Sequence, residues 1–237
     1  MPKETSKKQQ AFKMKIGIRC FVLALLSSQC AFSATVAISN VNSGGDAAYG
    51  VRDSSGVLVS GTNYKGVMGF FTVSDAAVTS AFAAGNTAAI SSAFSAFDPT
   101  SGSFALDTLA PGVFDASESF DTKASANAFG GSSIYTVLFK GADIATATEL
   151  LIAKLTTAFP TDPEVGLPLL ASASFNPSGI SSVLVGTSGG TAHDYGLGGG
   201  ALPTYGLSSV PALVPEPSRV LFLAFGAVGL LMRRRRA

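Results

Sequence analysis

Gly66-Val-Met-Gly-Phe-Phe-Thr-Val73 is the segment that decides the fold class of this chain. Its β-branched and aromatic residues favour an extended strand, because such side chains pack well on a pleated surface. Ile134-Tyr-Thr-Val-Leu-Phe139 has the same character and predicts a second strand. Shorter strands are predicted at residues 35–38, 56–59, 171–175 and 182–185. Glycine-rich turns separate these segments, so the body of the chain is expected to be mainly β.

Two short helices are predicted between the strands. Ser74 can cap a helix over residues 76–84, and Asn86 can cap a second helix over residues 87–96. We expect both helices to pack as a lid or corner against the sheet. Residues 146–155 are compatible with a strand or a helix, and the two prolines that soon follow favour a strand.

The body is long enough to bury a substantial core. It spans about 175 residues, and the chain contains 17 Phe and no Trp. We expect an antiparallel β-sandwich with a small two-helix insertion over residues 34–210. Residues 185–213 are rich in glycine and nearly uncharged, which predicts a loose final strand region that leads into a linker.

Charge is distributed unevenly, although the net charge of the whole chain is +1. Residues 1–33 carry six Lys or Arg and one acidic residue, and residues 215–237 carry five Arg and one Glu. Residues 34–214 carry five Lys or Arg and thirteen Asp or Glu. An acidic body repels phosphate backbones, so no nucleic-acid partner is expected. Cys20 and Cys30 both precede residue 34, so a domain without that segment has no disulfide and no thiolate metal site.

Residues 1–33 are interpreted as an N-terminal extension and a secretory signal peptide. After a basic start, Cys20-Phe-Val-Leu-Ala-Leu-Leu26 forms an apolar run that is too short to span a bilayer. Ala31 and Ser33 place small residues at the positions that signal peptidase requires for cleavage after Ser33. The polar residues before Met14 are atypical, so we expect the true start at Met14. The Sec translocon and signal peptidase are the expected partners.

Residues 211–237 form a terminal segment with three consecutive parts. Pro215, Glu216 and Pro217 form a rigid extended element, because each proline fixes φ. Residues 220–232 are uncharged and predict a C-terminal hydrophobic helix of about 20 Å, shorter than a hydrocarbon core of about 30 Å. The chain closes with four positive charges, which are expected to stay cytoplasmic and belong to Arg233, Arg234, Arg235 and Arg236.

This tail resembles the PEP-CTERM sorting signal of Gram-negative bacteria, since the motif, the apolar helix and the basic stop occur together at the terminus. The resemblance covers about 23 of the 237 residues. It implies recognition by an exosortase, a membrane protease-transferase that cuts near the Pro-Glu-Pro element, in bacteria that form exopolysaccharide and biofilm. The tail would then be a removable anchor. The alternative is a plain tail anchor in the inner membrane.

Few side chains of the body could carry chemistry. His193 is the only histidine and is followed by Asp194, but no Gly-x-Ser-x-Gly motif is present, so we interpret it as structural or exposed. Asp115, Glu118 and Asp121 could act as paired carboxylates in sugar hydrolysis or as calcium ligands. They lack the dense alternation of a calcium loop, so we interpret them as a solvated loop. No catalytic residue, cofactor or metal site is predicted.

The sequence therefore predicts an exported, non-enzymatic protein of the cell surface or extracellular matrix. Its Ser-, Thr- and Gly-rich surface would face extracellular polysaccharide. Two alternatives remain open. The first is a secreted carbohydrate-binding or carbohydrate-active module that uses the acidic cluster, and the second is a tail-anchored periplasmic protein.

Overall fold

The computed structural model describes residues 35–97, 103–119, 129–159 and 170–212. Within these ranges, no helix has both the length and the apolar character needed to cross a membrane. Several predicted features lie outside the described residues: the segment with Ala31 and Ser33, the apolar helix at 220–232, Pro215, Glu216, Pro217, and the arginines at 233–236.

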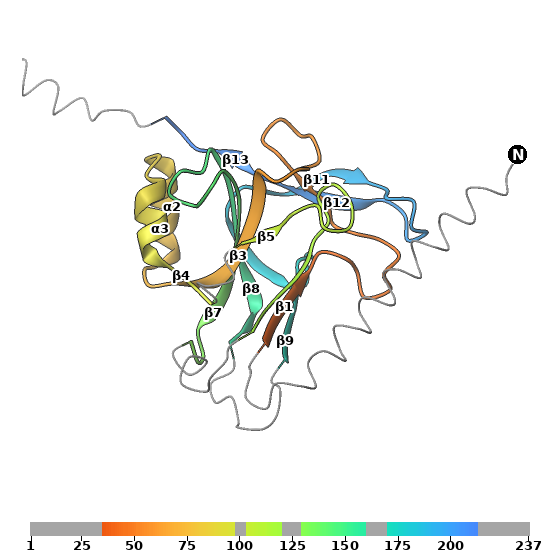
Figure 1. Ribbon diagram of the computed structural model, residues 1–237, viewed down its shortest axis with the longest axis horizontal. Helices are drawn as coiled ribbons and strands as arrows, with labels where there is room; N and C mark the ends of the chain where they lie inside the picture. Colours follow the sequence, from red (N-terminus) through yellow and green to blue (C-terminus); the bar gives the residue numbers. More distant parts are fainter. Residues whose placement is uncertain (1–34, 98–102, 120–128, 160–169, 213–237) are drawn as a thin grey trace, which may run out of the picture.

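The centre of the fold is a seven-stranded antiparallel sheet (Figure 1). Five strands follow one another in the order β10 (Ile180–Val185), β8 (Glu149–Ala158), β7 (Ser133–Lys140), β3 (Tyr64–Phe71) and β4 (Phe94–Ala96). Two short strands extend this sheet, β13 (Ser208–Ser209) beside β8 and β5 (Phe104–Ala105) beside β3. The strands predicted around β3, β7 and β10 are confirmed, and the ambiguous stretch 146–155 contributes to strand β8.

Two smaller sheets complete the β structure, which makes the protein mainly β as predicted. The first has the order β6 (Asp115–Ser119), β1 (Thr35–Ser39) and β9 (Leu170–Ser174). The second has the order β11 (Thr187–His193), β12 (Leu202–Gly206) and β2 (Val51–Arg52). The pairs β1–β9 and β12–β2 are parallel, so the arrangement is more complex than the antiparallel sandwich expected from the sequence.

The two faces of the central sheet are covered by different layers (Figure 1). One face packs against the smaller sheets, where Met68 and Leu138 of the central sheet join Val36 and Ile38 of β1 in one buried cluster. Tyr205 of β12 belongs to the same cluster and contacts Phe175 with ring centroids 4.8 Å apart. Each such side chain contributes about 1.5–3 kcal/mol through burial, so this core holds the sheets together.

The opposite face is covered by helices α2 (Asp75–Ala83) and α3 (Thr87–Ala93). Val78 of α2 and Ile90 of α3 pack on Val67, Val137 and Ile152 of the central sheet. The predicted position of the two helices against a sheet is therefore confirmed. An ion pair strengthens the contact, because the Lys154 ammonium lies 3.1 Å from the carboxylate of Asp75 at the start of α2.

The predicted helix caps are confirmed, but the second helix is shorter than predicted. The Ser74 hydroxyl accepts a hydrogen bond from the Ala77 amide, and the Asn86 side chain accepts one from the Ala89 amide. Helix α3 ends at residue 93 because residues 94–96 leave the helix and pair as β4 with the edge of β3. A helical pattern of Phe and Ile positions cannot reveal this competing strand pairing.

The strand predicted at residues 56–59 is wrong. The Asp53 carboxylate accepts hydrogen bonds from the amides of Ser55 and Val57, both at 2.9 Å, and folds the chain into a tight turn. Gly56 in this turn has φ +86°, which favours glycine. Only a single bridge between Arg52 and Leu58 remains of the expected strand.

Asn40 follows β1 and is completely buried. Its amide nitrogen donates hydrogen bonds to the carbonyl oxygens of Tyr49 and Gly112, each at 2.8 Å. Its amide oxygen accepts a hydrogen bond of 2.9 Å from the backbone of Phe114. One side chain therefore bonds to three backbone groups from two other segments of the chain. The Gly112 carbonyl also accepts a bond of 3.0 Å from the Val51 amide.

We predict that Asn40→Leu lowers the free energy of unfolding by about 3 kcal/mol or more, since an unsatisfied buried polar group costs about 1–3 kcal/mol. Urea denaturation followed by tyrosine fluorescence measures this, because the chain has five Tyr and no Trp. An unchanged midpoint would contradict the role assigned to the Asn40 amide.

Thr136, in the middle of β7, is a buried polar residue whose side chain lacks the hydrogen bonds that Asn40 has. Its side chain is fully buried, and its hydroxyl has no hydrogen-bond partner among the described residues. We predict that Thr136→Val raises the free energy of unfolding by about 1 kcal/mol, because a methyl group replaces an unsatisfied hydroxyl. The same urea titration measures the change. A clear loss of stability would show that the hydroxyl has a partner, such as a buried water.

Candidate functional site

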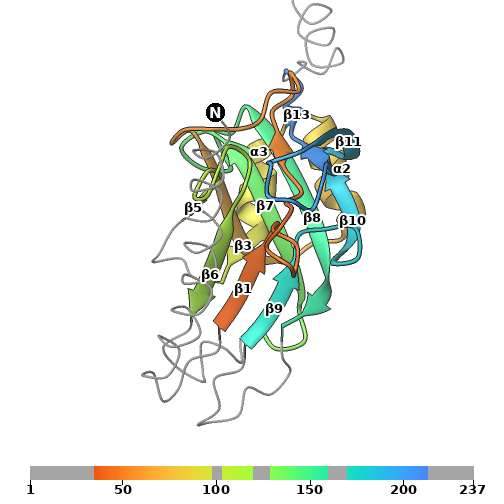
Figure 2. The same cartoon turned by 90° about the vertical axis from the view of Figure 1, so that its right-hand side faces the viewer.

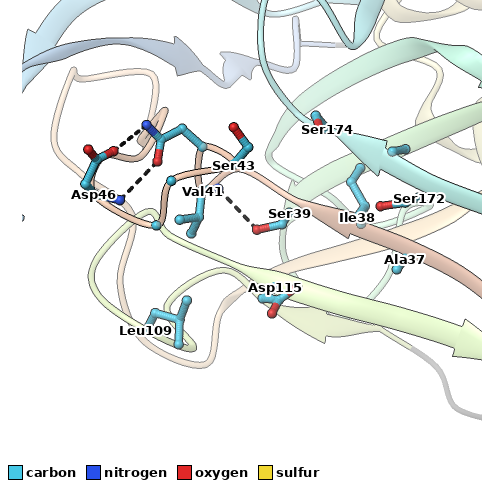
Figure 3. Close-up of a pocket in the computed structure, with 14 residues that line it drawn as sticks. Ala37, Ile38, Ser39, Val41, Ser43, Asp46, Leu109, Asp115, Ser172 and Ser174 are labelled. Atoms are coloured by element: carbon cyan, nitrogen blue, oxygen red, sulfur yellow. Dashed lines mark hydrogen bonds between the residues drawn. The ribbon is translucent and has the colours of Figure 1, made fainter. Parts of the chain in front are cut away.

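A cavity of about 550 Å³ lies where β1 ends, between the loop of residues 41–46 and the outer face of the β6–β1–β9 sheet (Figure 3). We call it the β1 cavity. Its volume falls in the range of about 300–1,000 Å³ that is typical of small-molecule sites. Its polar lining includes Ser39, Ser43, Asp46, Asp115, Ser172 and Ser174.

Strand register explains why these side chains meet. Ser39 of β1 pairs with Asp115 of β6 on one side and with Ser174 of β9 on the other. Residues directly opposite in neighbouring strands share one face of a sheet. The alternate residues Val36 and Ile38 are buried in the core, so the Ser39 row belongs to the outer face.

The loop that closes the other side of the β1 cavity is held by its own hydrogen bonds. The Asn42 amide nitrogen donates to the Asp46 carboxylate at 2.6 Å, and the Asn42 amide oxygen accepts from the backbone of Asp46 at 3.1 Å (Figure 3). The carbonyl oxygen of Asp46 accepts a further bond of 2.8 Å from the Gly199 amide. These hydrogen bonds define the shape of this wall of the cavity.

Asp115 is the least compensated charged group of the cavity. Its side chain is half-buried, and this burial alone raises the pKa of the Asp115 carboxyl above its usual value of 3.8. No cationic group among the described residues opposes the shift. Among the described residues, the lining of the cavity includes no Lys, Arg or His. The cavity therefore presents carboxylate and hydroxyl oxygens without a matching positive charge.

A second cavity of about 440 Å³ lies beside β2 and contains Arg52 in its wall. The guanidinium of Arg52 is already occupied, because it donates hydrogen bonds to Thr204, Gly56 and Thr191. Its role there is to join β2 to the strands β11 and β12. These acceptors are neutral, so Arg52 keeps its positive charge, but three of its five N–H groups are already bonded within the protein.

Of the residues singled out in the sequence, the structure describes Asp115, Glu118, His193 and Asp194, and these do not form one cluster. Asp115 and Glu118 lie on strand β6, so the predicted loop is wrong for both, and Asp121 lies outside the described residues. The register pairs Asp115 with Ser39 but Glu118 with Val36, and positions three apart in a strand belong to opposite faces. The ring of His193 lies against Tyr195, with ring centroids 4.4 Å apart.

Sequence reasoning missed Ser39, Asp46, Ser172 and Ser174 as neighbours of Asp115. The alternation of Ser and Ala in Leu170–Ser174 was a signal that serines occupy one face of that strand. However, the parallel pairing of β1 with β9 places them beside Ser39, and no local pattern in either segment encodes that pairing.

Comparisons with known proteins give no independent assignment: no protein-family model, curated protein or solved structure matches this chain. Among the described residues, no three His, Cys, Asp or Glu side chains gather closely enough to hold a metal ion. The β1 cavity must therefore be interpreted from its own geometry and charge.

We predict that Asp115→Asn raises the free energy of unfolding at pH 7. The folded-state pKa of Asp115 lies above the unfolded value, so its charged form destabilises the fold above that pKa. Below about pH 3, where the carboxyl is protonated in both states, the two proteins should have similar stability. Thermal denaturation at pH 7 and pH 3 measures both effects. If the Asn variant were less stable at pH 7, the Asp115 carboxylate would have a stabilising partner, which would contradict the view that it is buried without an opposite charge.

Proposed function

We propose that this chain is an exported, non-enzymatic protein of the cell surface or extracellular matrix that is sorted through its C-terminal tail. The Sec translocon would carry it across the inner membrane, and signal peptidase would cleave after Ser33. An exosortase would then recognise the tail and remove the anchor. The delivered domain would be associated with extracellular polysaccharide.

The order of elements in the tail is the observation that carries this proposal. Pro215-Glu216-Pro217 is followed by the uncharged residues 220–232 and then by the arginines at 233–236. A helix over residues 220–232 measures about 20 Å, so it is a poor permanent anchor in a core of about 30 Å. Such a segment is better suited to temporary retention before cleavage.

The geometry of the described body supports attachment through the tail. β1 begins at one end of the body, whereas the chain leaves after β13 at the opposite end (Figures 1 and 2). A tail that continues from residue 212 would therefore hold the domain by one end.

Intact-mass analysis of the protein from its native host tests the sorting step. We predict a mature species that begins at residue 34 and lacks residues 220–237, because signal peptidase and exosortase each remove one end. Replacement of Pro215, Glu216 and Pro217 by alanine should leave the tail attached. Ser218→Ala is the matched control beside the motif and should be processed normally.

Two results would overturn the proposal. A native protein that keeps residues 220–237 in cells with an active exosortase would instead be a tail-anchored periplasmic protein. A protein that keeps residues 1–33 would not have been handled by signal peptidase.

A further inference from the structure

We propose that the β1 cavity binds an amino-sugar unit, with the ammonium group of the sugar at Asp115 and sugar hydroxyls at Ser172 and Ser174. This inference rests on the proposed function only for the source of the ligand, which would be a cationic extracellular polysaccharide. The geometry of the cavity supplies the remaining arguments.

Charge is the first argument. Asp46 and Asp115 both line the cavity, and none of the described lining residues is basic. The described body around the cavity is part of the acidic segment 34–214, so the surrounding field also favours a cation. Burial removes part of the hydration of the Asp115 carboxylate, and an ammonium group placed there would offset that loss. The ammonium–carboxylate hydrogen bond is also stronger than one between neutral groups.

The arrangement of hydroxyl groups is the second argument. Ser172 and Ser174 are exposed on the same face of β9, and residues two apart on a strand are separated by about 6.6 Å. Ser39 lies in the neighbouring strand, about 4.8 Å away in the hydrogen-bonding direction. The Ser39 hydroxyl is already engaged, since it donates to the Phe114 carbonyl at 3.4 Å and accepts from the Val41 amide at 3.1 Å. Ser172 and Ser174 therefore supply the exposed hydroxyls, which can donate and accept as sugar hydroxyls do. The cavity therefore offers two exposed hydroxyl groups on β9 and a carboxylate on β6, on the same face of one three-stranded sheet.

A simple metal ion fits the cavity less well. Calcium takes about six to eight oxygen ligands, usually several carboxylates from one flexible loop. Here one oxygen of the Asp46 carboxylate already accepts the hydrogen bond from Asn42, and Asp115 stands on a different element of the fold. The part of the lining that the structure describes includes no aromatic ring on which a neutral sugar could stack. Charge must therefore supply much of the affinity, and binding should weaken as salt screens the ammonium–carboxylate pair.

Isothermal titration calorimetry of the full chain with defined probes tests this inference. The probes are a hexamer of glucosamine, the fully N-acetylated hexamer, and n-butylamine, which carries an ammonium group without hydroxyls. We expect binding of the glucosamine hexamer only. We expect Asp115→Asn to weaken it by about tenfold or more, because it removes the charge that pairs with the ammonium group. The double variant Ser172→Ala, Ser174→Ala should also weaken it while leaving the salt dependence in place.

Asp143→Asn is the matched control, because it removes an equal charge outside the cavity lining. It should bind the glucosamine hexamer as the unchanged protein does. Equal binding of n-butylamine, equal binding of the acetylated hexamer, or full binding by Asp115→Asn would each overturn the assignment, as would the absence of binding by the glucosamine hexamer. These outcomes do not depend on tail cleavage, so the failure of this inference and the failure of the sorting proposal are distinguishable.

Discussion

The hydrogen bonds of the buried Asn40 amide are the interaction on which the β6–β1–β9 sheet and the β1 cavity depend. It fixes the chain where β1 ends, and it holds the backbone around Tyr49 and around residues 112–114 at the same point. The first small sheet, the loop of residues 41–46 and the start of β6 all meet there. The hydrophobic cores set which faces are buried, but they are not directional. The Asn40 hydrogen bonds supply the direction, and they position both walls of the β1 cavity.

The parts of the fold that could be predicted are those with local causes. Ser74 and Asn86 mark helix starts through their own side chains, and the apolar residues of β3 and β7 favour strands wherever they pair. The failures have long-range causes. Residues 94–96 continue a helical pattern but pair with β3, and residues 115–118 look like a polar loop but pair with β1. In both cases the partner strand, which lies far away in the sequence, overrides the local preference.

In the candidate site, too, the features with local causes could be predicted and those with long-range causes could not. Asp115 stood out in the sequence because it belongs to an acidic cluster, yet its relevant neighbours are serines from β1 and β9 rather than Glu118. Strand alternation turns a sequence cluster into two separate faces, whereas register gathers residues that are far apart. The charge imbalance of the body was legible from composition. The strand pairings, which only the three-dimensional structure shows, decide where the negative charge is concentrated. They also decide which hydroxyl groups surround it.

The pairing of the earliest strands with the latest ones has a consequence for how the protein acquires its fold. β2 lies beside β12, and Arg52 hydrogen-bonds to Thr204 across 152 positions of the chain. Closing such long loops costs conformational entropy before the contacts compensate for it, so folding should be slow for a domain of this size. A chain that emerges from its N-terminus would leave β1 unpaired until residues 115–119 and 170–174 arrive, and β2 until residues 202–206 arrive. Protection from aggregation during that interval is therefore a requirement of this topology, whatever the destination of the protein.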